Sequence, residues 1–175
     1  MKTFKYLMLF GLILSLFGCG GGGGGGATQK EPDPVPVTPT AAVVKISTQG
    51  NLPEATSLAG VGITVSIPVG VTVKTENDGT VSSSVITPSG VTADKATIAP
   101  ADYVPATATT PGTLTFVLAS TDQAGFRTGE FVTVNLEGAV SNLNPTDITL
   151  TNFQPVNLAG EPVAGLAPTH TLELK

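Results

Sequence analysis

The sequence predicts an all-β fold, an antiparallel β-sandwich (jelly-roll) with about eight or nine strands. From residue 41 onward valine, threonine, glycine and proline dominate and charged residues are sparse, a composition that favours strands and turns. Apolar residues alternate with small polar ones in short runs, and turn signals recur roughly every ten residues. No segment has the periodicity of an amphipathic helix, and residues 41–175 have the size of one domain.

The first half of this domain contains the clearest alternation. A short strand is expected at 43–47, followed by a run whose apolar members are Val61, Ile63, Val65 and Ile67. Pro68 interrupts the pattern, which indicates an edge position or a crossing between sheets before a second run at 69–73. Residues 76–79 contain Asp-Gly and predict a tight turn, after which 81–85 should return as a strand.

Residues 87–111 are the least regular part, with Tyr103 and Val104 as the expected contacts to the core. A connection of this length usually contains some regular structure, so we expect a short strand or helical turn at 93–98. Regular alternation resumes with Leu114, Phe116 and Leu118 facing one way. Further strands are expected at 130–136, 148–153 and 169–174, with Phe153 on the face opposite Ile148 and Leu150 and a hairpin turn at 158–163.

Several of these segments resemble a known family. They are the runs Gly-Ile-Thr-Val-Ser-Ile-Pro at 62–68, Gly-Thr-Leu-Thr-Phe-Val-Leu-Ala-Ser at 112–120, Gly-Phe at 125–126, Gly-Glu-Phe-Val-Thr-Val at 129–134 and Leu-Ala-Gly-Glu-Pro-Val at 158–163. Together they are similar to cohesin-like modules of the carbohydrate-binding-module and cohesin superfamily. The resemblance implies a jelly-roll sandwich of about nine strands that binds an extracellular protein partner of the dockerin type. No motif marks partner-contacting residues, so the binding residues are unknown.

The amino terminus resembles a bacterial lipoprotein signal peptide. Lys2 and Lys5 precede an apolar run at 6–17 that is short for a membrane-spanning helix. The sequence Leu-Phe-Gly-Cys at 16–19 is similar to the lipobox of that family, although Phe17 is bulkier than usual. The resemblance implies that residues 1–18 are a signal peptide, that cleavage occurs between Gly18 and Cys19, and that Cys19 carries lipid, including palmitate-type acyl chains. Because Cys19 is the single cysteine, no disulfide can form within the chain.

Residues 19–40 are expected to be the lipidated cysteine and a Gly/Pro-rich tether. Seven glycines follow Cys19 and would span roughly 15 Å as a flexible coil. Residues 31–39 carry proline at almost every second position, which favours extended polyproline II over roughly 28 Å. The alternative, a proline-rich ligand for a recognition domain, is disfavoured because such partners are mainly intracellular.

Charge excludes some partners. Removal of residues 1–18 leaves six basic and thirteen acidic residues, a formal charge of −7. An acidic chain without a Lys/Arg cluster is a poor ligand for nucleic acid or for anionic membrane surfaces. We therefore expect no nucleic-acid partner and a membrane contact made through the acylated Cys19 alone.

No residue set predicts catalysis, so we expect no enzyme and no catalytic residues. His170 is the single histidine and lies near the end of the last strand, which favours a surface or strand-end role over a triad. Glu130 and Glu137, the candidate acid pair of a glycosidase, have an odd separation that places them on opposite faces of a strand.

No cofactor is expected, since transition metals need several His or Cys ligands. Structural calcium is the alternative, because it needs only oxygen ligands. Its candidate ligands form two groups, Glu76, Asn77 and Asp78 in one turn and Asp94, Asp102 and Asp122 on separate loops. The alternative to a calcium site is a purely structural turn, because Asp/Asn-Gly turns are common for backbone reasons alone.

A polysaccharide partner would usually stack on exposed aromatic rings. The mature chain offers Tyr103, Phe116, Phe126, Phe131 and Phe153 and no tryptophan. Phe116 lies on an apolar strand face, and Phe126 and Phe131 are either exposed or hold their loop in place.

These observations favour a non-enzymatic protein-binding or assembly module anchored by lipid to the bacterial cell envelope. Gly20 stands where an aspartate retains many lipoproteins at the inner membrane, so in a Gram-negative cell we expect the outer membrane. The alternatives are a carbohydrate-binding module of the same fold and a purely structural envelope lipoprotein.

Overall fold

The computed structural model describes residues 38–175 and contains ten strands and two short 3₁₀ helices. The elements, in chain order, are β1 (Ala41–Gly50), β2 (Leu58–Ile67), β3 (Val71–Thr72), β4 (Ile86–Pro88), η1 (Gly90–Thr92), β5 (Ala96–Ile98), β6 (Asp102–Val104), β7 (Gly112–Ser120), β8 (Gly129–Gly138), η2 (Pro145–Asp147), β9 (Thr149–Asn157) and β10 (Leu166–Leu174). The all-β prediction is confirmed. The structure has ten strands where eight or nine were predicted, and four of the ten, β3, β4, β5 and β6, have only two or three residues each. None of the helical segments described has the length and apolar character that a membrane-spanning helix needs.

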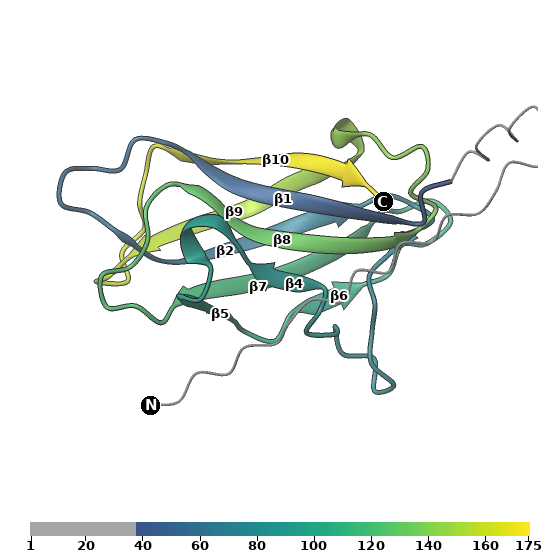
Figure 1. Cartoon of the computed structure of the whole chain (residues 1–175), viewed down its shortest axis with the longest axis horizontal. Helices are drawn as coiled ribbons and strands as arrows, with labels where there is room; N and C mark the ends of the chain where they lie inside the picture. The colour runs from purple at the N-terminus through teal and green to yellow at the C-terminus, as the bar shows by residue number, and fades with distance from the viewer. Residues whose placement is uncertain (1–37) are drawn as a thin grey trace, which may run out of the picture. The chain divides into compact units, whose positions relative to one another are not determined.

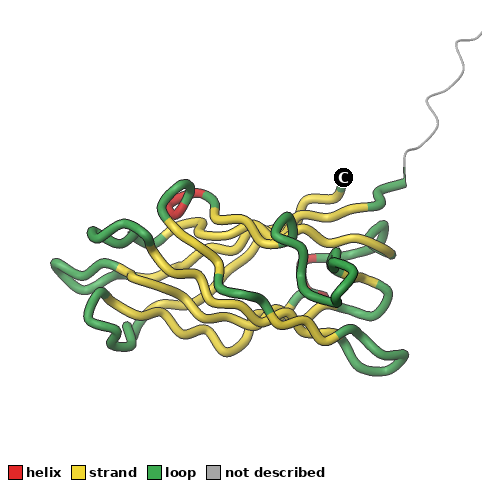
Figure 2. The backbone as a smooth tube through the Cα atoms, turned by 90° about the horizontal axis from the view of Figure 1, so that it is seen from below, coloured by secondary structure: helices red, strands yellow, loops and turns green. Residues whose placement is uncertain are grey.

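The strands form two antiparallel sheets that pack face to face as a sandwich (Figure 1). Sheet A has the order β10-β1-β8, with β3 and β4 both pairing with the free side of β8. Sheet B has the order β9-β2-β7, with β5 and β6 both pairing with β7. Loops gather at the two ends of the strands (Figure 2), and Thr40 N–H donates to Lys175 O, so the chain enters and leaves the sandwich at the same end.

The core lies between the sheets and follows the predicted alternation. Val61, Ile63, Val65 and Ile67 of β2 are at most 1% exposed, and Leu114, Phe116 and Leu118 of β7 pack beside them. Val44, Ile46, Val132, Val134 and Leu136 supply the opposing layer from sheet A. Burial of each such side chain contributes about 1.5–3 kcal/mol to the stability of the fold, and in the absence of a disulfide this packing is its main source of stability.

Pro68 marks a crossing between sheets, as its position suggested. β2 ends at Ile67 in sheet B and β3 begins at Val71 in sheet A. The residues between them form a turn in which Val71 N–H donates to Pro68 O, so Val69 is 53% exposed and does not share the buried face of Val71.

The Asp-Gly turn is confirmed, but the strand predicted after it is wrong. Gly79 has a φ of +85°, its N–H donates to Glu76 O, and Thr75 pairs with Val81. Residues 83–85 then form a second turn, and β4 begins only at Ile86. The sequence pattern failed here because Ser82 and Val85 are both buried, which breaks the alternation.

A β-bulge in β8 places two consecutive residues in the core. Ile46 lies opposite Val132 and Ser47 lies opposite Glu130, so Phe131 is the extra residue, and both Phe131 and Val132 are fully buried. The bulge also reverses the alternation between Glu130 and Glu137. The two carboxylates lie on the same outer face of sheet A, and the predicted opposite orientation is wrong.

A second bulge changes the orientation of Phe153. Gly62 lies opposite Gln154 and Thr64 lies opposite Thr151, and Asn152 in between has a φ of +50°. Asparagine tolerates this left-handed backbone better than most residues. Because the bulge shifts the alternation, Phe153 packs against the core on the side of Leu150, and its predicted outward orientation is wrong.

Residues 87–111 contain more order than the sequence pattern revealed. The element expected at 93–98 is present as β5, and η1 precedes it. Tyr103 in β6 packs against the core, whereas Val104 is 56% exposed, so only the first of the two predicted core contacts is confirmed.

Proline interrupts the outer side of the edge strands. In an antiparallel pair, residues alternate between bonding their neighbour and pointing away from it. Asn135 N–H donates to Val85 O and Ser89 N–H donates to Phe131 O, so Pro88 of β4 lies at an outward position. Lys175 and Ala41 exchange hydrogen bonds, and the same alternation places Pro168 of β10 outward. Pro100 follows β5 at an outward position, because Ala99 N–H donates to Val117 O.

Two edges are also covered by nearby chain. Along β9, Val163 N–H donates to Pro155 O and Asn157 N–H donates to Glu161 O, so the predicted turn at 158–163 folds onto this edge. Beside β10, His170 Nε2 donates to Pro145 O at 2.9 Å, which holds η2 against the strand. The edges of both sheets therefore offer few free donors for pairing with another strand.

We predict that Pro88→Val and Pro168→Val together promote self-association, because they restore outward N–H groups on both edges of sheet A. Light scattering coupled to size-exclusion chromatography should give a larger mass for the double variant than for the native chain. Pro53→Val, in an exposed loop, is the matched control and should leave the mass unchanged. Equal masses for all three proteins would contradict this role of the edge prolines.

Candidate functional site

The outer face of sheet B is the candidate site. Because β2 and β7 point their valine, isoleucine, leucine and phenylalanine side chains inward, the alternating residues between them lie on the outer face, where those of β7 are the more exposed and Thr64 of β2 is only 8% exposed. Cross-strand pairing extends this face over β9 on one side and over β5 and β6 on the other. The residues of this face are Gly62, Thr64, Ser66, Thr97, Asp102, Val104, Thr113, Thr115, Val117, Ala119, Thr149, Thr151 and Gln154.

Threonines form a row across the middle of this face. Thr64 lies opposite Thr115 on one side and Thr151 on the other. The hydroxyls of Thr64 and Thr115 are 3.0 Å apart, and Asn152 Nδ2 donates to Thr64 Oγ1 at 3.3 Å. These bonds fix the rotamers at the centre of the row, and because Thr64 is nearly buried, Thr115 and Thr151 supply the exposed methyl and hydroxyl groups.

The face carries one charged residue, Asp102, and two exposed valines. Val104 is 56% exposed and Val117 is 48% exposed. The outer face of sheet A differs, because Lys45 and Glu173 form an ion pair of 3.7 Å there and Glu130 and Glu137 lie on the same face. Of the two sheet faces, the one on sheet B loses the least hydration energy when it is covered.

The candidate acids do not form a catalytic pair. Glu130 and Glu137 share a face but lie seven residues apart along β8, about 23 Å at the usual strand rise. That distance is well beyond the separation of roughly 5–10 Å that glycoside hydrolysis uses. His170 contacts the backbone of η2, as described above, and it lies in the middle of β10 and not near the strand end where the sequence placed it.

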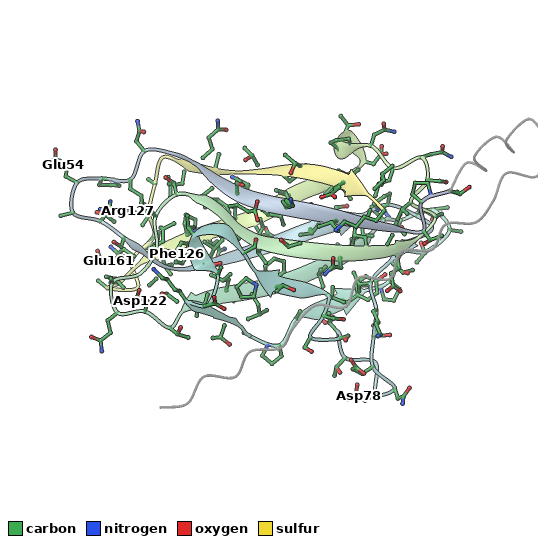
Figure 3. The ribbon with its side chains drawn as sticks, viewed as in Figure 1. Glu54, Asp78, Asp122, Phe126, Arg127 and Glu161 are labelled. Atoms are coloured by element: carbon green, nitrogen blue, oxygen red, sulfur yellow. The ribbon has the colours of Figure 1, made fainter. Side chains whose placement is uncertain are left out.

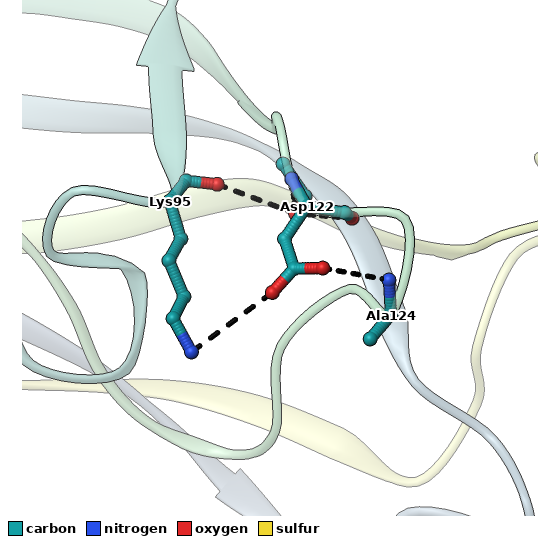
Figure 4. Close-up of polar contacts among 4 residues, drawn as sticks. Lys95, Asp122 and Ala124 are labelled. Atoms are coloured by element: carbon teal, nitrogen blue, oxygen red, sulfur yellow. Dashed lines mark hydrogen bonds and ion pairs between the residues drawn. The ribbon is translucent and has the colours of Figure 1, made fainter.

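The candidate calcium ligands, Glu76, Asn77 and Asp78 in one turn and Asp94, Asp102 and Asp122 on separate segments, lie at separate places on the sandwich. Asp122 lies at the end of the sandwich that also carries Arg127 and Glu161, whereas Asp78 lies far from it, on a turn that projects below the sheets in this view (Figure 3). Asp122 accepts a hydrogen bond from Ala124 N–H at 2.9 Å and lies 3.9 Å from Lys95 Nζ (Figure 4). Within residues 38–175 no three His, Cys, Asp or Glu side chains gather as a metal would require.

The aromatic rings do not form a platform on the described part of the chain. Phe116, Phe126 and Phe131 are at most 4% exposed, and Tyr103 and Phe153 pack against the core. Phe126 holds its loop in place, since it exchanges backbone hydrogen bonds with Leu58. The reading of Phe126 and Phe131 as exposed rings is therefore wrong.

Gly18 and Cys19 lie outside the described residues, so cleavage and lipidation stay predictions, as do the boundaries at 18 and 40. Sequence reasoning missed the outer face of sheet B. The small polar residues between the buried ones were visible as a pattern, but their assembly depends on which strands are neighbours.

Comparison with known proteins gives one structural similarity. No family model matches the chain, and no match is found among curated proteins. A non-cellulosomal cohesin from the hyperthermophilic archaeon Archaeoglobus fulgidus aligns over 71% of this chain and 75% of that chain, with 14% sequence identity and a TM-score of 0.43. Similarity at this level does not assign the chain to a family.

We predict that Thr80→Val raises the pKa of Asp78. The Thr80 hydroxyl donates to Asp78 Oδ1 at 2.6 Å and the Thr80 N–H donates to the same atom at 3.0 Å, and these bonds, the hydroxyl first, hold the pKa of Asp78 below its ordinary value. A lowered pKa in the folded state means that the ionised carboxylate supports the turn above the unfolded-state pKa, and that this support is lost as the pH falls through the folded-state pKa. An NMR titration of the Asp78 carboxyl group measures the change, Thr109→Val is the control, and an unaltered pKa in Thr80→Val would contradict the assignment.

Proposed function

We propose that this chain is a lipid-anchored, non-enzymatic protein-binding module whose partner docks on the outer face of sheet B. The observation that carries the proposal is the near absence of charge on this face, together with the exposure of Val104 and Val117. The centres of protein interfaces are depleted of charged residues because a buried, unpaired charge is costly. A sheet face that is permanently in water has no such constraint.

The size of the face limits how the partner binds. Four strands about 4.8 Å apart and roughly seven residues long give a surface of roughly 450 Å². A standard interface takes about 800 Å² from each partner. The partner must therefore also contact loops beside the sheet, or else bind weakly and reversibly.

The edge strands argue for binding through side chains. Strand addition requires a row of free backbone donors and acceptors along an edge. Proline at outward positions of β4 and β10 and the chain that covers β9 interrupt that row. We therefore propose recognition by the side chains of the sheet face and not by β-augmentation.

Charge introduced on this face should weaken binding. We predict that Thr115→Arg/Val117→Arg reduces partner binding at least about tenfold, because the partner would have to bury two unpaired cations. Thr87→Arg, on the exposed outer face of sheet A, is the matched control. The measurement is affinity capture from the envelope of the source organism with the full chain as bait, followed by binding assays with the captured protein.

The outcomes separate the candidate functions. A single protein whose capture is lost only in the sheet B variant supports the proposal, and a dockerin-type sequence in that protein would match what the sequence resemblance implies. If Thr87→Arg reduces capture to the same extent, the binding site lies elsewhere than on the outer face of sheet B. Retention of polysaccharide alone would favour the glycan-binding alternative, although the aromatic rings that motivated it are buried or packed against the core. If nothing is retained, a structural envelope role becomes the better proposal.

We propose that the module is attached to the bacterial envelope through acylated Cys19, at the outer membrane in a Gram-negative cell. The lipobox-like sequence at 16–19 and the glycine at position 20 support this proposal. Two or three acyl chains, each stabilised by about 0.8 kcal/mol per buried CH₂, suffice for stable anchoring. Detectable hydrolysis of any envelope polymer by the purified protein would contradict the non-enzymatic role.

We predict that Cys19→Ser releases the protein from the membrane fraction and abolishes incorporation of radiolabelled palmitate, since the serine hydroxyl does not accept the lipid that the thiol accepts. Gly22→Ser, three residues further along the tether, is the control and should stay in the membrane fraction with its label. Membrane retention and labelling of Cys19→Ser would show that the anchor lies elsewhere.

A further inference from the structure

The turn at residues 76–79 contains the one place in the chain where an aspartate or asparagine is followed directly by glycine, Asp78–Gly79. At such a step the nitrogen of the glycine can attack the side-chain carboxyl carbon before it, because glycine has no side chain to obstruct the approach. Residues 75–80 are all exposed, and a Cβ added at Gly79 would meet no atom within 4 Å. The surrounding fold therefore places nothing in the way of this attack.

We propose that Asp78 is a site of isoaspartate formation in this protein and that the Thr80 hydroxyl keeps the reaction slow in the folded chain. The inference does not rest on the proposed function, because this turn is not part of the outer face of sheet B. It rests on the hydrogen bonds that the turn makes to the two groups that would have to react.

The reaction needs no oxidant or reductant. A bond forms between the Gly79 nitrogen and Asp78 Cγ, and one carboxyl oxygen leaves as water, which takes one hydrogen from the Gly79 N–H and one from the protonated carboxyl group. Water then opens the resulting five-membered succinimide ring at either of its two carbonyl carbons. One opening restores aspartate, and the other gives isoaspartate, in which the main chain runs through the side-chain carbon of residue 78.

The turn opposes each requirement of this attack. The Thr80 hydroxyl donates to Asp78 Oδ1 at 2.6 Å and the Thr80 N–H donates to the same atom at 3.0 Å, so the carboxylate is held toward Thr80. Both bonds favour the ionised form and lower the pKa of Asp78, whereas the attack needs a protonated carboxyl group. The Gly79 N–H, which must lose its hydrogen, donates to Glu76 O at 3.0 Å.

The modification would alter one wall of a groove. An apolar groove of about 600 Å³ lies between β4 and β5, and residues 80–83 belong to its lining. These residues are held by a short hairpin, in which Glu76 N–H donates to Thr80 O at 2.8 Å and Ser82 N–H donates to Lys74 O at 3.0 Å. Isoaspartate at residue 78 inserts one additional backbone carbon inside this hairpin, so its two arms can no longer keep this register.

The rate of isoaspartate formation in the full chain tests the inference. After incubation at neutral pH, mass spectrometry of the tryptic fragment 75–95 measures the isoaspartate fraction at residue 78. Thr80→Val should form isoaspartate at least about threefold faster than the native chain, because it loses one of the two hydrogen bonds to the ionised carboxylate. Thr80→Ser keeps the hydroxyl and should react at the native rate.

The same three chains in guanidinium chloride complete the test. There the turn is absent, so all three should form isoaspartate at one common rate that exceeds the rate of the folded native chain. Equal rates for the folded native chain and folded Thr80→Val would overturn the role of the hydroxyl, as would a folded Thr80→Ser that reacts as fast as Thr80→Val.

The remaining outcomes also contradict the inference. A folded native chain that reacts as fast as the denatured chain would show that the turn gives no protection. A difference between Thr80→Val and the native chain that persists in guanidinium chloride would assign the effect to the local sequence and not to the folded turn. An absence of isoaspartate at residue 78 in the denatured chains would remove the site.

Discussion

Two open β-sheets have four edges with unpaired backbone groups, and in this molecule proline residues or nearby chain segments obstruct these edges. Proline takes outward positions in β4 and β10 and directly after β5, and the turn after Asn157 folds back on β9. Single-cysteine composition removes disulfides as a means of closing the sandwich, so edge protection and core packing act together.

Because the sheet edges are obstructed, the proposed recognition of a partner uses the side chains of a sheet face. The outer face of sheet A carries an ion pair between Lys45 and Glu173, whereas the outer face of sheet B has a threonine row and two exposed valines. The outer face of sheet B and the groove between β4 and β5 are separate parts of the sandwich.

The two bulges show where strand patterns stop being a guide. Period-two alternation assumes that every residue of a strand has one partner, and it gave the correct inward set for β2 and β7. Phe131 and Asn152 have no partner of their own, so the residues beyond them change face. Phe153 and the Glu130–Glu137 relation were mispredicted for this reason alone. A bulge is selected by contacts with the neighbouring strand, which the local sequence does not contain.

The sequence by itself determined the all-β class, the inward and outward sets of β2 and β7 and the Asp-Gly turn at residue 79. These features depend on neighbouring residues along the chain, through steric preference and alternation. The tertiary structure decided that β2 lies between β7 and β9, that an uncharged face results, and that β4 and β5 enclose a groove. Each of these depends on contacts between residues tens of positions apart, where packing of the whole core, and not local propensity, selects the neighbour.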